Sequence, residues 1–214
     1  MKISHVGNDE LTILNKGRFA NAYVYRYKTL KHDITIKDFH HCPSIIRVTY
    51  GRLMAKKEVN IINKLNGING ITSNAYMLSP YTCAFNYVEG TAIKSKYNIP
   101  ELTFIQLESI INSIHDREIV HLDLRNYGNI ITDNNNIPYI IDFQTGISTK
   151  YFPKIVKALL RKIDISGVYK AWYKYDKKSM PDDKILFLND FKSIRRLWPF
   201  KGYPITRLIE RIKS

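Results

Sequence analysis

Three polar residues in the middle of the chain have the types and spacing that phosphoryl transfer requires. Asp123, Asn129 and Asp142 lie within the 28 residues from 119 to 146. A carboxylate can orient a hydroxyl group and accept its proton, whereas an amide oxygen and a second carboxylate can share a magnesium ion. We therefore interpret Asp123 as the residue that positions an acceptor hydroxyl, and Asn129 and Asp142 as metal ligands.

A β-hairpin is the element that must bring the two metal ligands together. Residues 129–132 and 138–141 form short apolar runs, and residues 133–136 read Asp-Asn-Asn-Asn. These turn residues tolerate left-handed conformations and bond to their own backbone, so the pattern predicts two antiparallel strands joined by a tight turn. Asn129 begins the first strand and Asp142 follows the second. The two ends are neighbours in such a pair.

At this point the chain resembles the protein kinase superfamily. The run His121-Leu-Asp123-Leu-Arg125 with Asn129 resembles the catalytic loop H-R-D-L-x-x-x-N, and Asp142-Phe-Gln144 resembles D-F-G. The resemblance implies that Asp123 positions the acceptor and that Arg125 stabilises charge on the transferring group. We expect His121 to support the loop from the core rather than to act as a base.

The chain departs from the kinase pattern at two places. Asn129 lies six residues after Asp123, where the kinase pattern has five, so Asn126 is a rival metal ligand. Gln144 replaces the glycine of D-F-G, which argues against a swinging activation segment but leaves Asp142 as a metal ligand.

The N-terminal half offers the cation and the helical carboxylate that a kinase site needs. Residues 33–39 alternate like a strand and resemble the V-A-I-K motif, which makes Lys37 the candidate that holds the phosphates of ATP. Residues 52–65 have helical apolar spacing, and Glu58 is the only glutamate between Lys37 and Glu89. The resemblance therefore pairs Lys37 with Glu58.

Two further segments resemble nucleotide-binding parts of a kinase. The loop between strand-like residues 11–14 and 22–27 keeps one glycine, Gly17, where G-x-G-x-x-G has three. Residues 83–90 resemble the hinge that ends E-Y-x-x-G, and adenine recognition there uses main-chain groups. We therefore expect Gly17, Tyr87, Val88 and Glu89 to contact the nucleotide.

The expected fold is α+β, a bilobal protein kinase-like fold. Residues 1–88 are the predicted N-lobe, a small antiparallel sheet with one helix, and residues 89–214 are the predicted C-lobe, which is short and mostly helical. Helical spacing occurs at residues 102–114, 152–163, 181–197 and 205–213. The 72 residues after Asp142 contain no A-P-E motif. The chain thus resembles minimal superfamily members, the RIO kinases and the lipopolysaccharide core (Kdo-type) sugar kinases.

Composition and charge bear on location and partners. The chain has 214 residues, a hydrophobic fraction of 44% and a net charge of +14. Residues 150–214 carry 17 Lys and Arg against 6 Asp and Glu, a net +11. Because no apolar stretch is long enough to span a bilayer and no signal peptide is evident, we expect a cytoplasmic protein, peripheral to the inner membrane face at most. The basic end is suited to an anionic membrane or glycolipid, or to RNA.

The sequence therefore predicts an ATP- and Mg²⁺-dependent phosphotransferase that transfers the γ-phosphate to a hydroxyl. The acceptor is expected to be a lipopolysaccharide or glycolipid sugar, or a protein serine. Two alternatives stay open at this stage. One is a RIO-like ATPase or kinase associated with RNA or ribosomes, and the other is a pseudokinase scaffold that binds partners through its basic end.

Overall fold

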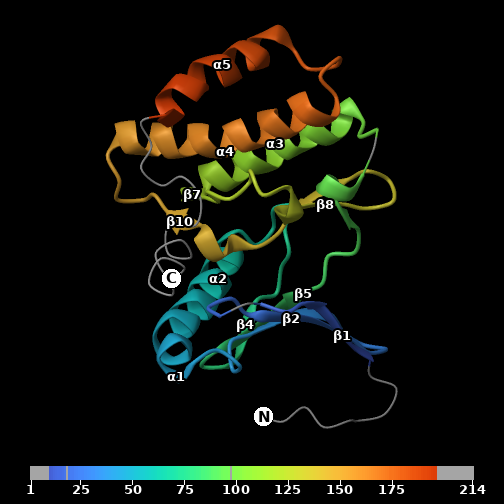
Figure 1. The fold of residues 1–214 in the computed structure, drawn as a ribbon, viewed down its shortest axis with the longest axis vertical. Coiled ribbons are helices and arrows are strands. Elements are labelled where there is room, and N and C mark those ends of the chain that lie inside the picture. The colour runs from blue at the N-terminus through green and yellow to red at the C-terminus, as the bar shows by residue number, and fades with distance from the viewer. Residues whose placement is uncertain (1–9, 18, 97, 197–214) are drawn as a thin grey trace, which may run out of the picture.

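A computed structural model describes residues 10–17, 19–96 and 98–196. A five-stranded antiparallel sheet and a helix form one lobe, and three stacked helices form the other (Figure 1). The sheet has the order β1-β2-β3-β5-β4. Its strands are β1 (Glu10–Asn15), β2 (Tyr23–Lys28), β3 (Asp33–Asp38), β4 (Tyr76–Ser79) and β5 (Thr82–Asn86). The predicted small antiparallel N-lobe sheet is confirmed.

The N-lobe helix begins earlier than the sequence predicts. Three contiguous pieces follow Pro43, namely α1 (Ser44–Ile46), a π-helical turn η1 (Arg47–Gly51) and α2 (Arg52–Lys64). Apolar spacing identified only the last piece. Residues 45–49 read Ile-Ile-Arg-Val-Thr, and β-branched side chains lower helix propensity, so the local pattern does not predict a helix there.

Short strands and turns lie between the N-lobe and the large helices. The hairpin strands β8 (Ile130–Thr132) and β9 (Pro138–Ile140) pair antiparallel, with Ile130 opposite Ile140, which confirms the predicted hairpin. The strand β6 (Thr91–Ala92) adds to β8, and β7 (Ile119–Val120) pairs with β10 (Ile147–Ser148). Single 3₁₀ turns occur at η2 (Ile93–Ser95), η3 (Tyr127–Asn129) and η4 (Phe143–Thr145).

Three helices build the part of the C-lobe that the structure describes, namely α3 (Glu101–Asp116), α4 (Lys154–Tyr175) and α5 (Asp182–Arg196). The helix predicted for residues 152–163 continues to Tyr175, because Trp172 packs into the core and stacks on Phe104 with ring centroids 5.4 Å apart. The helix predicted for residues 205–213 lies outside the described residues. No helix in the described part of the chain is long and apolar enough to cross a membrane.

Candidate active site

Three of the predicted site residues meet at the buried side chain of Lys37. The Nζ atom of Lys37 donates hydrogen bonds to Glu58 Oε1 and to Asp142 Oδ1, each over 2.7 Å. The Lys37 and Glu58 side chains are only 8% and 2% exposed, whereas that of Asp142 is 37% exposed. The three residues come from β3, from α2 and from the end of the hairpin. The structure thus brings together residues that are 21 and 105 positions apart in the sequence.

The ion pairs set the charge states at this centre. Burial acts to lower the pKa of Lys37, but Asp142 and Glu58 outweigh it, so the pKa of Lys37 is raised. Burial acts to raise the pKa of Asp142, but the lysine outweighs it and the pKa of Asp142 is lowered. For Glu58, burial raises the pKa and Lys37 offsets only part of this effect. A charged Lys37–Asp142 pair is therefore favoured at neutral pH.

Local structure explains why Lys37 and Glu58 meet. Lys37 lies in the centre of the sheet, paired with Val24 on β2 and with Cys83 on β5. Glu58 lies on the face of α2 that also buries Ala55 and Ile62. A helix packed on a sheet by its apolar face carries i+3 and i+4 neighbours inward with it. The carboxylate is therefore carried into the core towards the strand.

The catalytic-loop residues form a second hydrogen-bonded group. Asn129 is buried, and its Nδ2 donates to Asp123 Oδ2 over 2.9 Å and to the Asp123 carbonyl over 3.1 Å. Its Oδ1 accepts from Asn126 Nδ2 over 3.2 Å. The Oδ1 of Asn126 in turn accepts from the backbone N–H of Gly128. Asn126 thus caps the turn η3, and Asn129 is the amide that contacts Asp123 directly.

The two proposed metal ligands lie at adjacent ends of the hairpin. The backbone N–H of Ile141 donates to the carbonyl of Asn129 over 3.0 Å, which places Asp142 one residue from that contact. Asp142 itself adopts a left-handed conformation, with φ of 66°. Amide and carboxylate oxygens are the hard ligands that Mg²⁺ prefers, so the donor set fits this ion. No group of three His, Cys, Asp or Glu residues could hold a metal among the residues described. Further ligands would therefore have to be water and phosphate oxygens.

His121 supports the catalytic loop from the core. It is fully buried, its Nε2 lies 3.0 Å from the carbonyl of Ile141, and its Nδ1 accepts from the backbone N–H of Asp123 over 3.2 Å. A carbonyl can only accept a hydrogen bond, so the proton is on Nε2 and the lone pair of Nδ1 is occupied. This geometry leaves no nitrogen of His121 free to act as a base.

Sequence reasoning missed Asp164 on α4. Its side chain is fully buried and accepts from the backbone N–H groups of His121 and Leu122, each over 2.7 Å, and lies 3.1 Å from His115 Nε2. Leu122 has a φ of 67°, a conformation that costs free energy for a leucine. Asp164 therefore holds the strained start of the catalytic loop. The sequence could have indicated Asp164, because it is the one acidic residue in the otherwise basic helix α4 and lies between Ile163 and Ile165.

Arg125 and Gly17 are two further predicted site residues. The Arg125 side chain is half-buried, and its Nε has no hydrogen-bond partner among the described residues. A Cβ on Gly17 would lie 2.2 Å from the carbonyl oxygen of Asn21. The close approach of the loop to itself therefore explains the glycine whether or not a phosphate binds there.

The predicted hinge residues follow β5. The backbone N–H of Tyr87 donates to the carbonyl of Asp33, so this group is already bonded. The Tyr87 ring lies under the guanidinium of Arg26, 3.9 Å from its centroid. Tyr87, Val88 and Glu89 line a cavity of about 470 Å³ together with the hairpin turn. The ring centroid of Phe85, which belongs to the predicted hinge segment 83–90, is 5.8 Å from Lys37 Nζ.

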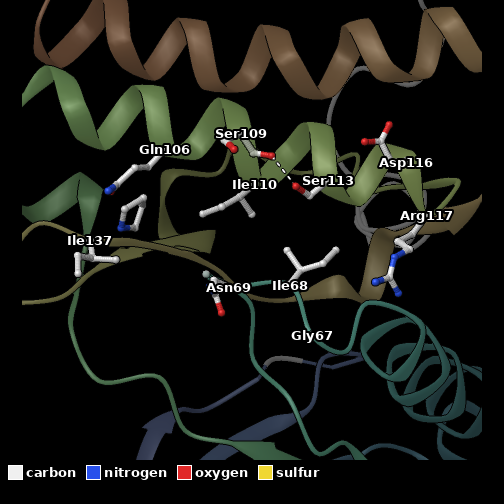
Figure 2. A pocket seen from close by; sticks show the side chains of 12 residues that line it. Gly67, Ile68, Asn69, Gln106, Ser109, Ile110, Ser113, Asp116, Arg117 and Ile137 are labelled. Carbon is white, nitrogen blue, oxygen red and sulfur yellow. Dashed lines mark hydrogen bonds between the residues drawn. The ribbon is translucent and has the colours of Figure 1, made fainter.

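A second cavity, of about 540 Å³, lies between α3 and the loop that follows α2 (Figure 2). Gln106 and Ser113 line it from α3, Arg117 from the residue after α3, and Asn69 from the loop. Neither cavity is lined by Lys37 or by the other predicted metal and catalytic residues. Of the predicted site residues, only Tyr87, Val88 and Glu89 line one of these two cavities.

Solved structures and one curated protein resemble the chain. Rio2 kinase from Chaetomium thermophilum in an ADP/Mg²⁺-phosphoaspartate complex has a TM-score of 0.62 and 14% identity, covering 86% of this chain and 62% of that one. A second structure of this Rio2 kinase has a TM-score of 0.61 and 14% identity, covering 83% and 63%. The EKC/KEOPS complex subunit BUD32 of Enterocytozoon bieneusi (strain H348) is 29% identical over 104 residues, covering 41% of this chain. No family model matches.

The chain has the fold of the protein kinase-like superfamily, as the resemblance at the catalytic loop and hairpin predicts. The solved structures of Rio2 kinase share this fold, and the curated subunit BUD32 is similar in sequence. The chain spans 50% of the length of the curated relative that it matches and about three fifths of the Rio2 chains.

Proposed function

We propose that this chain is an ATP- and Mg²⁺-dependent phosphotransferase that transfers the γ-phosphate to a hydroxyl group. The observation that carries the proposal is the position of Lys37 Nζ, 2.7 Å from both Glu58 and Asp142. A purely structural buried ion pair needs only one carboxylate, and a second, partly exposed one adds a group that a metal can use. Rio2 kinase, which has a similar fold, has been solved in a complex with ADP and Mg²⁺, and this supports the same cofactors here.

In this proposal each residue has one role. Lys37 contributes positive charge to the phosphates, and Glu58 orients Lys37. Asn129 and Asp142 hold Mg²⁺, which when bound neutralises negative charge on the phosphates. Asp123 orients the acceptor hydroxyl and takes its proton, and Arg125 stabilises charge on the transferring group. Gly17 and the main chain of Tyr87, Val88 and Glu89 cover the nucleotide.

A thermal unfolding titration tests the proposal. Mg²⁺ with ATP should raise the melting temperature of the wild-type protein, because a ligand bound only to the folded state stabilises it by about 2.7 kcal/mol at 100 times its Kd. Asp142→Asn should lose most of this shift, since a neutral amide is a weaker metal ligand. Asp116→Asn, an exposed residue at the end of α3, is the matched control. No shift in wild type would contradict the proposal and favour a pseudokinase scaffold.

The acceptor hydroxyl is proposed to lie on a glycolipid sugar or on a protein serine. Incubation of extract with labelled ATP, followed by separation of lipid from protein, distinguishes the two. Label that appears in neither fraction, while ATP is hydrolysed, would point to an ATPase instead.

An RNA-associated kinase or ATPase is the second candidate, and it rests on a basic and aromatic surface beside the catalytic loop. Lys174 Nζ lies 5.1 Å from the ring centroid of Tyr127 and 4.7 Å from that of Tyr175, and Lys170 Nζ lies 6.0 Å from that of Tyr127. Lys94 Nζ is 3.2 Å from the point where a Cβ on Gly128 would lie. Lysines interleaved with aromatic rings are typical of surfaces that bind single-stranded nucleic acids.

Binding of a single-stranded RNA oligonucleotide, followed by fluorescence anisotropy at several salt concentrations, tests this candidate. The double variant Lys170→Ala/Lys174→Ala should weaken binding and reduce the slope of log K against log salt by about 1.4, which is two phosphate contacts at about 0.7 each. Lys56→Ala, on the exposed face of α2, is the control and should leave the slope unchanged. Binding to anionic vesicles without binding to RNA would instead favour the membrane or glycolipid partner.

A further inference from the structure

Gln144, which stands where D-F-G has glycine, reaches from the hairpin end to the N-lobe. Its Nε2 donates to the hydroxyl of Tyr50 over 3.4 Å, across 94 positions of sequence. Its backbone N–H also hydrogen-bonds the carboxylate of Asp142. One residue therefore touches both the candidate metal ligand and the π-helical turn that precedes α2.

On the C-lobe side, the segment after Asp142 is tightly bonded. Thr145 Oγ1 donates to the carbonyl of His121 over 2.8 Å, and Ile147 pairs with Val120. The backbone N–H of Thr149 donates to the carbonyl of Glu118 over 2.7 Å. Only eleven residues separate Asp142 from the first residue of α4. These bonds fix the backbone of the segment against the catalytic loop.

On the N-lobe side, Tyr50 is held in place by packing. Its ring meets Phe39 edge to face, with centroids 6.5 Å apart, and a Cβ on the next residue, Gly51, would lie 2.9 Å from the Phe39 Cβ. Burial raises the pKa of Tyr50, so the phenol keeps its proton. Tyr50 lies in the π-helical turn η1, which leads directly into α2.

The same segment meets α2 at two more points. The backbone N–H of Phe143 hydrogen-bonds the carboxylate of Glu58. A Cβ on Gly146 would lie 3.3 Å from Ile61 Cδ1, so α2 packs closely over this turn. Three contacts from residues 143–146 thus face the helix and its leading turn, and of these three only the one between Gln144 and Tyr50 joins two side chains by a hydrogen bond.

We propose that Gln144 and Tyr50 are positioning residues that hold Asp142 in place against the Lys37–Glu58 pair. A glycine at position 144 has no side chain to make this contact, so the replacement adds a link between the lobes. The part of this inference that concerns the metal rests on the proposed function. The part that concerns how firmly residues 143–147 are held does not depend on the proposed function.

Hydrogen exchange of the nucleotide-free protein tests the link. Tyr50→Phe and Gln144→Leu each remove the hydrogen bond at nearly constant volume. Each should accelerate exchange of the backbone amides of residues 143–147 roughly 3- to 10-fold, the net worth of one hydrogen bond. The double variant should exchange no faster than either single variant, because both remove the same bond. Tyr76→Phe, on the exposed edge strand β4, is the control and should leave these amides unchanged.

Calorimetry with ATP tests the positioning role. If Gln144 and Tyr50 orient Asp142, both variants should raise the Kd for ATP with Mg²⁺ at least 3-fold more than the Kd for ATP in EDTA. A residue that merely stabilised the fold would not separate these two constants.

Each outcome decides one point. Unchanged exchange in either variant, or effects that add in the double variant, would overturn the link. Equal weakening with and without Mg²⁺ would overturn the positioning role. Failure of the wild-type protein to bind ATP would end the proposed function instead, and the exchange measurement would still decide whether the link exists.

Discussion

Asp123→Asn should lower the turnover number about 10²- to 10⁴-fold, which is the usual contribution of a positioned general base. The Kd for ATP with Mg²⁺ should change little, because Asp123 is assigned to the acceptor and not to the nucleotide. The asparagine can still accept the hydrogen bond that Asn129 Nδ2 now donates to Asp123 Oδ2 over 2.9 Å, so the loop should keep its shape. Single-turnover assays with labelled ATP, beside calorimetry, measure the two quantities separately.

Asp133→Asn is a suitable control for this variant. Asp133 lies at the hairpin turn, where its Oδ1 accepts from the backbone N–H groups of Asn135 and Ile137. The same change of charge is thus made in the same hairpin region, away from the acceptor position. Wild-type turnover in Asp123→Asn would show that another group takes the proton.

Asp164→Ala should reduce the free energy of unfolding by about 3–5 kcal/mol, since it leaves buried donors without their charged acceptor. The donors are the backbone N–H groups of His121 and Leu122, together with the ring of His115. Chemical denaturation followed by circular dichroism measures the change. If this variant does not fold, Asp164→Asn, which keeps one acceptor oxygen, should show a smaller loss.

Asp190→Asn on α5 provides the comparison, because this aspartate is exposed and should change stability by no more than about 0.5 kcal/mol. Hydrogen exchange adds a local measure. The amides of His121 and Leu122 should exchange faster in Asp164→Asn than in wild type, whereas those in the N-lobe sheet should not. Equal free energies of unfolding for Asp164→Asn and Asp190→Asn would refute the assigned role of Asp164.

The sequence predicts those parts of the fold in which local pattern and tertiary contact agree. Three segments have a local pattern that fits only one kind of element. They are the alternating residues around Lys37, the helical spacing around Glu58 and the turn residues 133–136, and all three elements form as expected. The kinase-like fold, which the solved structures of Rio2 kinase share, is predicted from the same residues. The assignments of individual roles in catalysis stay predictions, because they depend on ligands and not on the fold.

The parts that were missed have a common physical cause. Asp164 accepts from backbone N–H groups 42 and 43 positions away, and the early start of the N-lobe helix at Ser44 also has no signal in the local sequence pattern. A buried carboxylate on a helix looks like any surface acid until the backbone N–H groups that it accepts from are known. Likewise, residues 45–49 include β-branched side chains of weak helix propensity, so the local pattern does not predict a helix there.

The contact between Lys37 and Asp142 has a consequence for how the protein folds. Lys37 and Asp142 are 105 positions apart, so bringing them together costs loop-closure entropy before the contact itself stabilises the chain. We therefore expect this contact to form late in folding, after the sheet and the hairpin each exist. Partly folded species would then lack the ion-pair centre altogether. A nucleotide that requires it would bind the completed molecule alone, and could draw the last step of folding to completion.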